Sequence, residues 1–427
     1  MNKLKTIFIT SVGRLSLIAL FLCAVSASAQ QALTWDQVKA KFEDVNPALK
    51  ADQSNVDEAK AEEITAFLRP NPDFNVGVDG VQPFTSHPYR PFTNVSYGAS
   101  LGYLWERDNK RNLRRISAEQ NTAVTASQHV DLERNLLFTL RSAFVQTIEA
   151  KAVLELARAD LDYYDKIIDI SRDRFKAGDL AQIDLDRIEL LRVQYESEIE
   201  NATVNLRTQK IALLQMLDDR TPIDQFDVSG PFGFDTNLQS VDDLRQMALN
   251  SRPDLEAALQ GIEEAKTNHK LAVANGSTDP TWSVDLGYAR SNIPPIVLYA
   301  GISVDLPLRI FDHNQGEKQR TLIDITRNQQ LTEQARGQVF SDVDSAYEQV
   351  RSNIALLIPY RDKYKAQATR VRDTVTFSYQ HGGASLMDFL NAQSDYRVVQ
   401  LAYLQLIGSY LTAAGQLNLA VGREVIQ

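Results

Sequence analysis

Cysteine is almost absent from this chain. The only one is Cys23, which lies in an apolar run from Leu15 to Val25. Phe21 and Leu22 precede it, where a lipoprotein signal has small residues, so acylation of Cys23 is not expected. Beyond this position, disulfides and thiolate metal sites are excluded.

The first 29 residues have the three zones of a secretory signal peptide. Lys3, Lys5 and Arg14 precede or open the apolar run, and Ala27-Ser28-Ala29 provides a small-residue cleavage site. We therefore expect a signal peptide over 1–29. Its removal takes away three positive charges, so the net charge falls from -10 to -13. Because nucleic-acid binding needs a basic surface, this class of partner is not expected.

Long apolar runs are also lacking after the signal. No run of about 18 apolar residues follows it, so a membrane helix is not expected. If the chain enters a membrane, it must do so as a closed barrel, because a lipid-exposed backbone needs all its hydrogen bonds satisfied.

Residues that catalyse reactions or bind cofactors are sparse. The sequence contains no His-x-x-x-His pair, Gly-x-Ser-x-Gly elbow or phosphate loop. The histidines are scattered at His87, His129, His269, His313 and His381. His313 lacks nearby partners and is interpreted as a helix-start residue. An enzyme, a cofactor and a metal site are therefore not expected.

An internal repeat organises what is present. The stretch Asn46-Pro47-Ala48-Leu49-Lys50 returns as Arg252-Pro253-Asp254-Leu255-Glu256, and residues 174–178 return as 378–382. We predict two structural repeats, over 30–238 and 239–427, with the same order of elements. Chance similarity between helical segments is the alternative, but the two anchors keep nearly one register.

Each half contains two segments in which apolar and small polar residues alternate. These segments predict strands over about 73–81 and 94–106, then over about 281–289 and 297–307. Their length suits tilted strands that cross a bilayer. Tyr103, Trp105 and Trp282 would lie at the membrane interface. The alternative is a soluble sheet with one solvated face; the secretion signal and the flanking helices favour the barrel.

The remaining sequence predicts long helices. Residues 34–69 have helical patterning that Pro70 and Pro72 end. Helical hairpins are expected over 108–218 and 313–422, with coiled-coil spacing and with reversals at Gly178 and Gly382-Gly383. An uninterrupted helix over 108–174 would be about 100 Å long at 1.5 Å per residue. Pro359 should kink the equivalent helix.

Four strands cannot close a barrel with a pore, because about eight only fill their own interior. Closure therefore needs several copies, and three copies give twelve strands, enough for an aqueous lumen. The expected fold is an α+β membrane protein with four β-strands and long antiparallel coiled-coil helices per protomer. Its trimer forms a 12-stranded β-barrel on an α-helical periplasmic tunnel.

With this order of elements, the chain resembles the TolC family of outer-membrane efflux proteins. The most specific stretches are the hairpin tips at 174–185 and 379–390. The resemblance implies a homotrimer in the bacterial outer membrane with its helical tunnel in the periplasm. It also implies a periplasmic adaptor and an inner-membrane efflux pump as partners. A soluble periplasmic coiled-coil scaffold and a secreted enzyme are the alternatives from other classes.

Two further stretches narrow the resemblance. Residues 109–114 are similar to the Gly-Lys-Arg motif of the CzcC-like, heavy-metal branch, with Asn109 where that branch has glycine. Residues 306–316 resemble the same branch. This implies metal-cation export by a resistance-nodulation-division pump. Export of organic compounds, or of a protein by type I secretion, stays open.

The resemblance also implies a periplasmic gate. Asp184 and Asp388 match aspartates that line the closed entrance, and three-fold symmetry would make each a ring of carboxylates that attracts cations. Asn391 replaces the family's second aspartate. Tyr379 matches a tyrosine of the closing network, whereas Ala384 replaces its arginine partner. The alternative is that both aspartates cap the returning helices.

The hairpin tips are the expected docking site for the adaptor. Gly178, Leu180 and Ala181 align with the family's tip motif, whereas Asp179 replaces an apolar residue. The second tip contributes Gly382, Gly383, Ala384 and Ser385. A plain chain reversal is the alternative interpretation.

Overall fold

The computed structural model describes residues 32–84, 91–92, 95–289 and 297–426. The expected signal peptide and His87 lie outside these ranges. The described elements of the first half are α1 (Trp35–Val45), α2 (Pro47–Phe67), β1 (Asp73–Asp79), β2 (Ser96–Leu104), α3 (Lys110–Ala177), α4 (Gln182–Met216) and the short 3-10 helix η1 (Ile223–Gln225).

The second half repeats this order of helices and strands. It contains α5 (Val241–Ser251), α6 (Pro253–Asn275), β3 (Thr281–Ala289), β4 (Val297–Asp305), α7 (Gln315–Pro359), α8 (Lys365–Gln380) and α9 (Leu386–Val421). The π-helical turn η2 (Tyr360–Tyr364) joins α7 to α8. The strands lie within the alternating segments of the sequence.

The repeated Asn/Arg-Pro motif lies at the junction of two helices in each half. Pro47 and Pro253 are the first residues of α2 and α6, where a missing N–H costs nothing. The Asn46 side chain accepts hydrogen bonds from two N–H groups of α2. Arg252 makes no such cap and instead binds Asp254. The backbone junction is therefore the shared feature, and its side-chain chemistry differs.

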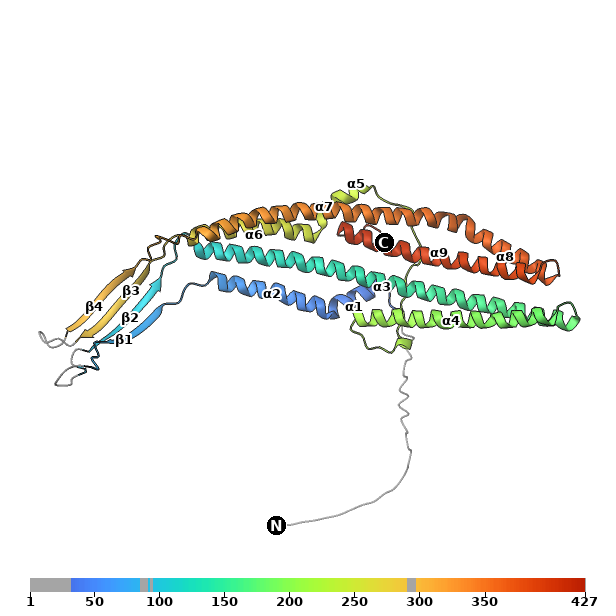
Figure 1. Ribbon diagram of the computed structural model, residues 1–427, viewed down its shortest axis with the longest axis horizontal. Coiled ribbons are helices and arrows are strands. Elements are labelled where there is room, and N and C mark those ends of the chain that lie inside the picture. Colours follow the sequence, from blue (N-terminus) through green and yellow to red (C-terminus); the bar gives the residue numbers. More distant parts are fainter. Residues whose placement is uncertain (1–31, 85–90, 93–94, 290–296, 427) are drawn as a thin grey trace, which may run out of the picture.

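The helices are as long as the sequence indicates. α3 has 68 residues, which is about 100 Å at 1.5 Å per residue. The counterpart run in the second half is divided: α7 ends at Pro359, where the π-helical turn begins, and the path changes direction towards α8 (Figure 1). A proline removes one backbone hydrogen bond, so this confirms the expected irregularity at Pro359.

The strands form one antiparallel meander in the order β1-β2-β3-β4, which extends from one end of the helices (Figure 1). Large apolar side chains point to one face, for example Val76, Leu101, Leu286 and Ile302, each at least half exposed. The opposite face carries mostly Gly, Ser, Asn and Asp. The described helices do not cover the apolar face, so it is exposed to solvent in the isolated protomer.

The hydrophobic core lies among the helices, in three clusters along their length. One joins α5, α7 and α9 around Val343 and Leu417; a second surrounds Phe42 of α1; a third lies near the hairpin tips around Tyr164. Among the described helices, α9 is the only one whose length and apolar composition would allow it to cross a bilayer. Since Leu417 is fully buried in the first cluster, α9 packs here as a bundle helix.

A buried ion pair anchors the sheet to the helices. Lys110, the first residue of α3, is 3% exposed, and its ammonium donates to Asp279 at 2.6 Å and to the Ser277 carbonyl at 3.1 Å. Arg111 next to it donates to the Phe67 carbonyl at 2.6 Å. Asn109 adopts the left-handed conformation that glycine also favours. This stretch therefore ties the segment before β3 and the end of α2 to the start of α3.

We predict that Lys110→Met destabilises the protein by about 3 kcal/mol, because the substitution leaves the Asp279 carboxylate partly buried without its cation. Thermal unfolding of the purified protein, followed by helical circular dichroism, measures this change. Lys60→Met is the matched control, since the Lys60–Asp57 pair is exposed and such pairs contribute little. Equal unfolding midpoints for the two variants would refute the anchoring role.

Candidate functional site at the hairpin tips

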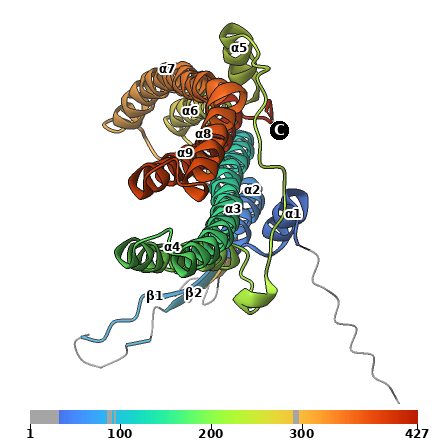
Figure 2. The ribbon, with the colours of Figure 1, turned by 90° about the vertical axis from the view of Figure 1, so that its right-hand side faces the viewer.

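The two long hairpins end side by side at the end opposite the sheet (Figures 1 and 2). The α3–α4 tip reverses at Gly178, which has φ +85 and donates its N–H to the Phe175 carbonyl at 3.0 Å. The α8–α9 tip reverses at Gly382, with φ +79. Only glycine adopts this backbone conformation without strain, so both reversals occur where the glycines predicted them.

The eight residues predicted to dock a partner lie at these two tips. Gly178, Asp179, Ala181, Gly382, Gly383 and Ser385 are exposed, whereas Leu180 and Ala384 are partly buried. A Cβ placed on Gly178 would have nothing within 4 Å. The tips are therefore accessible in the protomer, and their docking role stays a prediction.

Asp184 and Asp388 occupy equivalent positions, each the third residue of the helix that returns from its tip. Asp388 forms a capping box with Ser385, whose hydroxyl donates to the carboxylate at 2.6 Å. This bond, together with the Ser385 N–H, lowers the pKa of Asp388. Asp184 is partly buried and caps nothing within the described residues. Capping thus accounts for Asp388 but not for Asp184. Asn391 is exposed one turn beyond Asp388.

Tyr379 lies in the interior of the tip rather than on its surface. Its ring is 3% exposed and stacks on Phe389 at 5.0 Å between centroids. The Arg174 guanidinium lies 5.2 Å from the ring centroid and donates to the Tyr379 carbonyl at 2.6 Å. Arg174 of the other hairpin therefore contacts this tyrosine through its carbonyl and its ring, whereas the Tyr379 hydroxyl is buried without a hydrogen-bond partner among the described residues. The tip motif at 174–185 did not by itself indicate this contact, and the closing network stays a prediction.

A second link joins the hairpins further from the tips. Arg397 of α9 binds Glu198 of α4 through two hydrogen bonds of 2.8 and 3.0 Å. Tyr163 of α3 donates its hydroxyl to Thr376 of α8 at 3.0 Å. Because each bond connects α3–α4 with α8–α9, any separation of the two hairpins must break it.

Asp160 of α3 lies in the same seam, in a cavity of about 500 Å³ that Glu198 and Arg397 also line. One of its carboxylate oxygens is buried without a hydrogen-bond partner among the described residues. Burial raises the pKa of Asp160 to about 6, which Glu198 reinforces and Arg397 and Arg372 oppose. Sequence reasoning missed this residue, because one acid on a long, highly charged helix carries no distinguishing signal.

The three predicted interface aromatics lie together at the helix end of the sheet. Tyr103 and Trp282 are directly paired across β2 and β3, and Trp105 follows β2 immediately. Trp105 and Trp282 are 60% and 45% exposed. They extend the apolar face towards the helices, and their place at a membrane interface stays a prediction.

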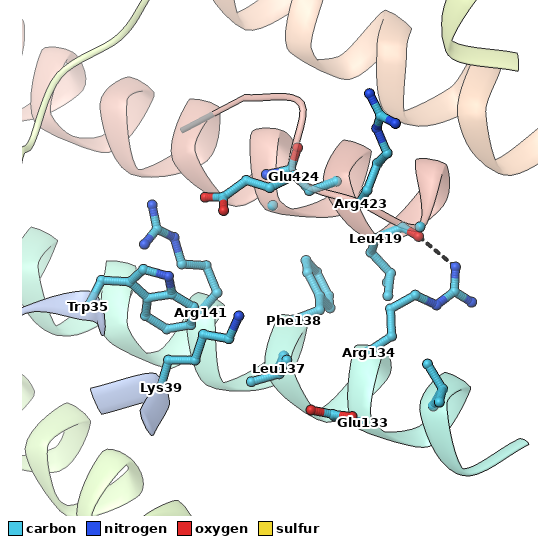
Figure 3. A pocket seen from close by; sticks show the side chains of 14 residues that line it. Trp35, Lys39, Glu133, Arg134, Leu137, Phe138, Arg141, Leu419, Arg423 and Glu424 are labelled. Atoms are coloured by element: carbon cyan, nitrogen blue, oxygen red, sulfur yellow. Dashed lines mark hydrogen bonds between the residues drawn. The ribbon is translucent and has the colours of Figure 1, made fainter. Parts of the chain in front are cut away.

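A separate cavity of about 290 Å³ lies where α1, α3 and the end of α9 meet (Figure 3). Arg141 lies 4.6 Å from the Trp35 ring centroid, and burial lowers its pKa. Arg134 donates to the Leu419 carbonyl at 2.7 Å. Charges of both signs line this cavity, including Glu133 and Lys39. It joins the start of the described chain to its end, far from the tips.

The histidines in the described ranges are apart from one another. His129 contacts Asp52 at 2.8 Å and His269 contacts Thr321 at 3.0 Å. His313 directly precedes the Asn314 cap of α7, as expected of a helix-start residue. Over these same ranges, no group of three His, Cys, Asp or Glu residues could hold a metal ion.

Comparison with known proteins gives consistent matches. Residues 244–423 match the model of the outer membrane efflux protein family. The cobalt-zinc-cadmium resistance protein CzcC of Cupriavidus metallidurans is 22% identical over 390 residues, covering 88% of this chain and 86% of that protein.

Two solved structures have the same fold. CusC, described as forming a transmembrane channel, aligns with a TM-score of 0.75 at 16% identity over 91% of this chain and 92% of its own. The outer membrane protein VceC of Vibrio cholerae aligns with a TM-score of 0.72 at 17% identity over 92% of this chain and 97% of its own.

We predict that the hairpin seam is tighter at pH 5 than at pH 7.5. The raised pKa of Asp160 means that the closed seam favours the protonated acid. This stabilisation is complete below the ordinary value of 3.8 and is lost as pH rises through about 6. Spin labels on Ala181→Cys and Met387→Cys measure the tip separation.

Asp160→Asn should hold the tips at the short distance at both pH values. Asp162→Asn, an exposed site on the same helix, should retain the wild-type pH response. Identical distance distributions for the wild-type protein at the two pH values would contradict the role of Asp160.

Proposed function

Since this chain belongs, through residues 244–423, to the outer membrane efflux protein family, we propose that three copies form one channel-tunnel that exports cargo from the cell. The protein resides in the bacterial outer membrane, with its helices in the periplasm. In the proposed trimer, the three sheets close into a twelve-stranded barrel, and the hairpins form a tunnel below it.

The observation that carries this proposal is the exposed apolar face of the sheet. Val76, Leu286 and Ile302 represent a face that extends across all four strands. β1 and β4 are each paired on one side only. In the trimer, lipid contacts the apolar face, and the strands of neighbouring copies form hydrogen bonds with the edges of the sheet. A soluble scaffold would leave both exposed to water, so this alternative is disfavoured.

The position of the tips supports the proposed partners. A tunnel of about 100 Å brings Gly178 and Gly382 deep into the periplasm, where an adaptor and an inner-membrane pump can reach them. We propose that the tips dock this adaptor and that the channel itself has no chemical step. Energy for transport then comes from the pump.

Two observations support metal cations as the cargo of a resistance-nodulation-division pump. The relative CzcC is a cobalt-zinc-cadmium resistance protein. Within the described strands, the polar face carries Asp73, Asp79, Asp285 and Asp305 and no Lys or Arg. Three copies would line the barrel with carboxylates, a field that favours cations. Organic compounds or a protein secreted by a type I system are the alternative cargoes.

We predict that the protein purified in detergent has the mass of a trimer and forms cation-selective channels in planar bilayers. Light scattering gives the mass, and the reversal potential in a salt gradient gives the selectivity. A monomer that is soluble without detergent would refute the proposal. Trimeric channels that prefer anions would leave the channel in place and overturn the proposed cargo.

We propose that Asp184 and Asp388 form the entrance gate. Asp184→Ala combined with Asp388→Ala should raise the leak conductance and weaken block by divalent cations, because both carboxylate rings are lost. Single-channel records measure both quantities. Unchanged records would refute the gate assignment.

Two controls separate the gate from helix capping. Ser385→Ala removes the cap of α9, at a typical stability cost of about 1 kcal/mol, but keeps the Asp388 charge, so block should persist. Asp186→Ala removes an exposed carboxylate from the same turn of α4 and should leave conductance unchanged.

A further inference from the structure

Three glycines lie side by side on the polar face of the sheet. Gly77 of β1 pairs with Gly98 of β2, and Gly98 pairs with Gly287 of β3. Tyr299 of β4 completes this row across the sheet. Because glycine has no side chain, the row is a shallow trough three strands wide. Glycine weakens a strand interior and often marks a place where another group approaches closely.

The Tyr299 ring occupies this trough. A Cβ placed on Gly287 would lie 2.1 Å from Cζ, 2.2 Å from the hydroxyl oxygen and 2.5 Å from Cε1 of Tyr299. A Cβ on Gly98 would lie 4.0 Å from the same hydroxyl. The ring therefore extends from β4 across β3 towards β2 and lies directly on the Gly287 backbone. No side chain larger than hydrogen at residue 287 is compatible with this position.

Tyr299 stands out on its face of the sheet. Among the described strand residues of the polar face, it is the only aromatic one. It is the third residue of β4, so it lies near the end of the sheet that is away from the helices (Figure 1). Its ring is 46% exposed, with one side on the glycines and the other open.

We propose that Tyr299 determines the width of the outer mouth of the channel and that the glycine trough keeps its ring against the wall. The proposal rests on the proposed barrel, in which the polar face lines the lumen. Three rings at one level would then surround the path of the cargo. When the three rings lie flat against the barrel wall, the mouth is open. When the rings turn away from the wall, they narrow the mouth.

The strand ladder explains why the ring and not the backbone would move. β3 is hydrogen-bonded on both sides, to β2 and to β4, so it cannot shift to admit a side chain at residue 287. The Tyr299 side chain can change its χ1 rotamer, and the other staggered positions carry the ring off the glycine. A single methyl group on Gly287 should therefore turn all three rings towards the lumen.

The test compares two glycines on the polar face, one covered by the Tyr299 ring and one not. Gly287→Ala places a methyl under the ring, whereas a Cβ on Gly301, on the same face, would be 3.9 Å from the Asp285 Cβ and meets no clash. In planar bilayers, Gly287→Ala should have a lower single-channel conductance than the wild-type protein, whereas Gly301→Ala should have the same conductance. The double variant Gly287→Ala with Tyr299→Ser should regain the wild-type conductance. Tyr299→Phe alone should leave the conductance unchanged. Equal conductance for Gly287→Ala and the wild-type protein would overturn the proposal.

A second measurement keeps the proposal testable if Gly287→Ala does not assemble. Tyr299→Cys retains all the glycines, and the chain's own cysteine is at position 23, within the expected signal peptide. A bulky, charged thiol reagent added to the outer side should then reduce the current through Tyr299→Cys and leave the wild-type current intact. Modification without loss of current refutes Tyr299 as the width-determining residue. Absence of channels from the wild-type protein refutes the proposed function instead.

Discussion

The structure depends on an apolar sheet face that the described helices do not cover. Val76, Leu286 and Ile302 would be costly in water at this exposure, and the helices that could have packed against them extend away instead. In the proposed trimer, lipid covers this face and the strands of neighbouring copies pair with its edges. In that proposal, the membrane position and the oligomer have the same physical origin, because the described part of the protomer covers neither the apolar face nor the edge strands.

The helical part, unlike the sheet, buries apolar residues within the protomer. Its buried clusters lie among helices. The two hairpins meet through an apolar cluster around Tyr164 and Tyr379 and through a few polar contacts. Arg174 on Tyr379 and Arg397 on Glu198 each connect one repeat with the other. Such links are specific and can be broken without dismantling either hairpin. A seam of this kind suits the proposed tunnel entrance, which has to close and open, and the raised pKa of Asp160 predicts that the strength of the seam depends on pH.

The two repeats share a backbone plan but not its chemistry. Asn46 caps a helix where Arg252 forms ion pairs, and Asp388 has a capping partner that Asp184 lacks. Tyr299 likewise has no aromatic equivalent on the polar face of the other strands. These differences lie at the helix junctions, at the tips and near the end of the sheet away from the helices. In the proposed channel, the side chains at these places meet the other repeat or the path of the cargo.

The sequence by itself determined the elements. Alternation with period two marked the strands, proline-free runs marked the helices, and Gly178 and Gly382 marked the reversals, because each pattern depends on local backbone geometry. Only the tertiary structure revealed the partner of Tyr379, the buried oxygen of Asp160 and the ring of Tyr299 on Gly287. Each of these features depends on residues from different elements. Periodicity places a side chain on a face, but the packing of elements against one another decides what that side chain touches.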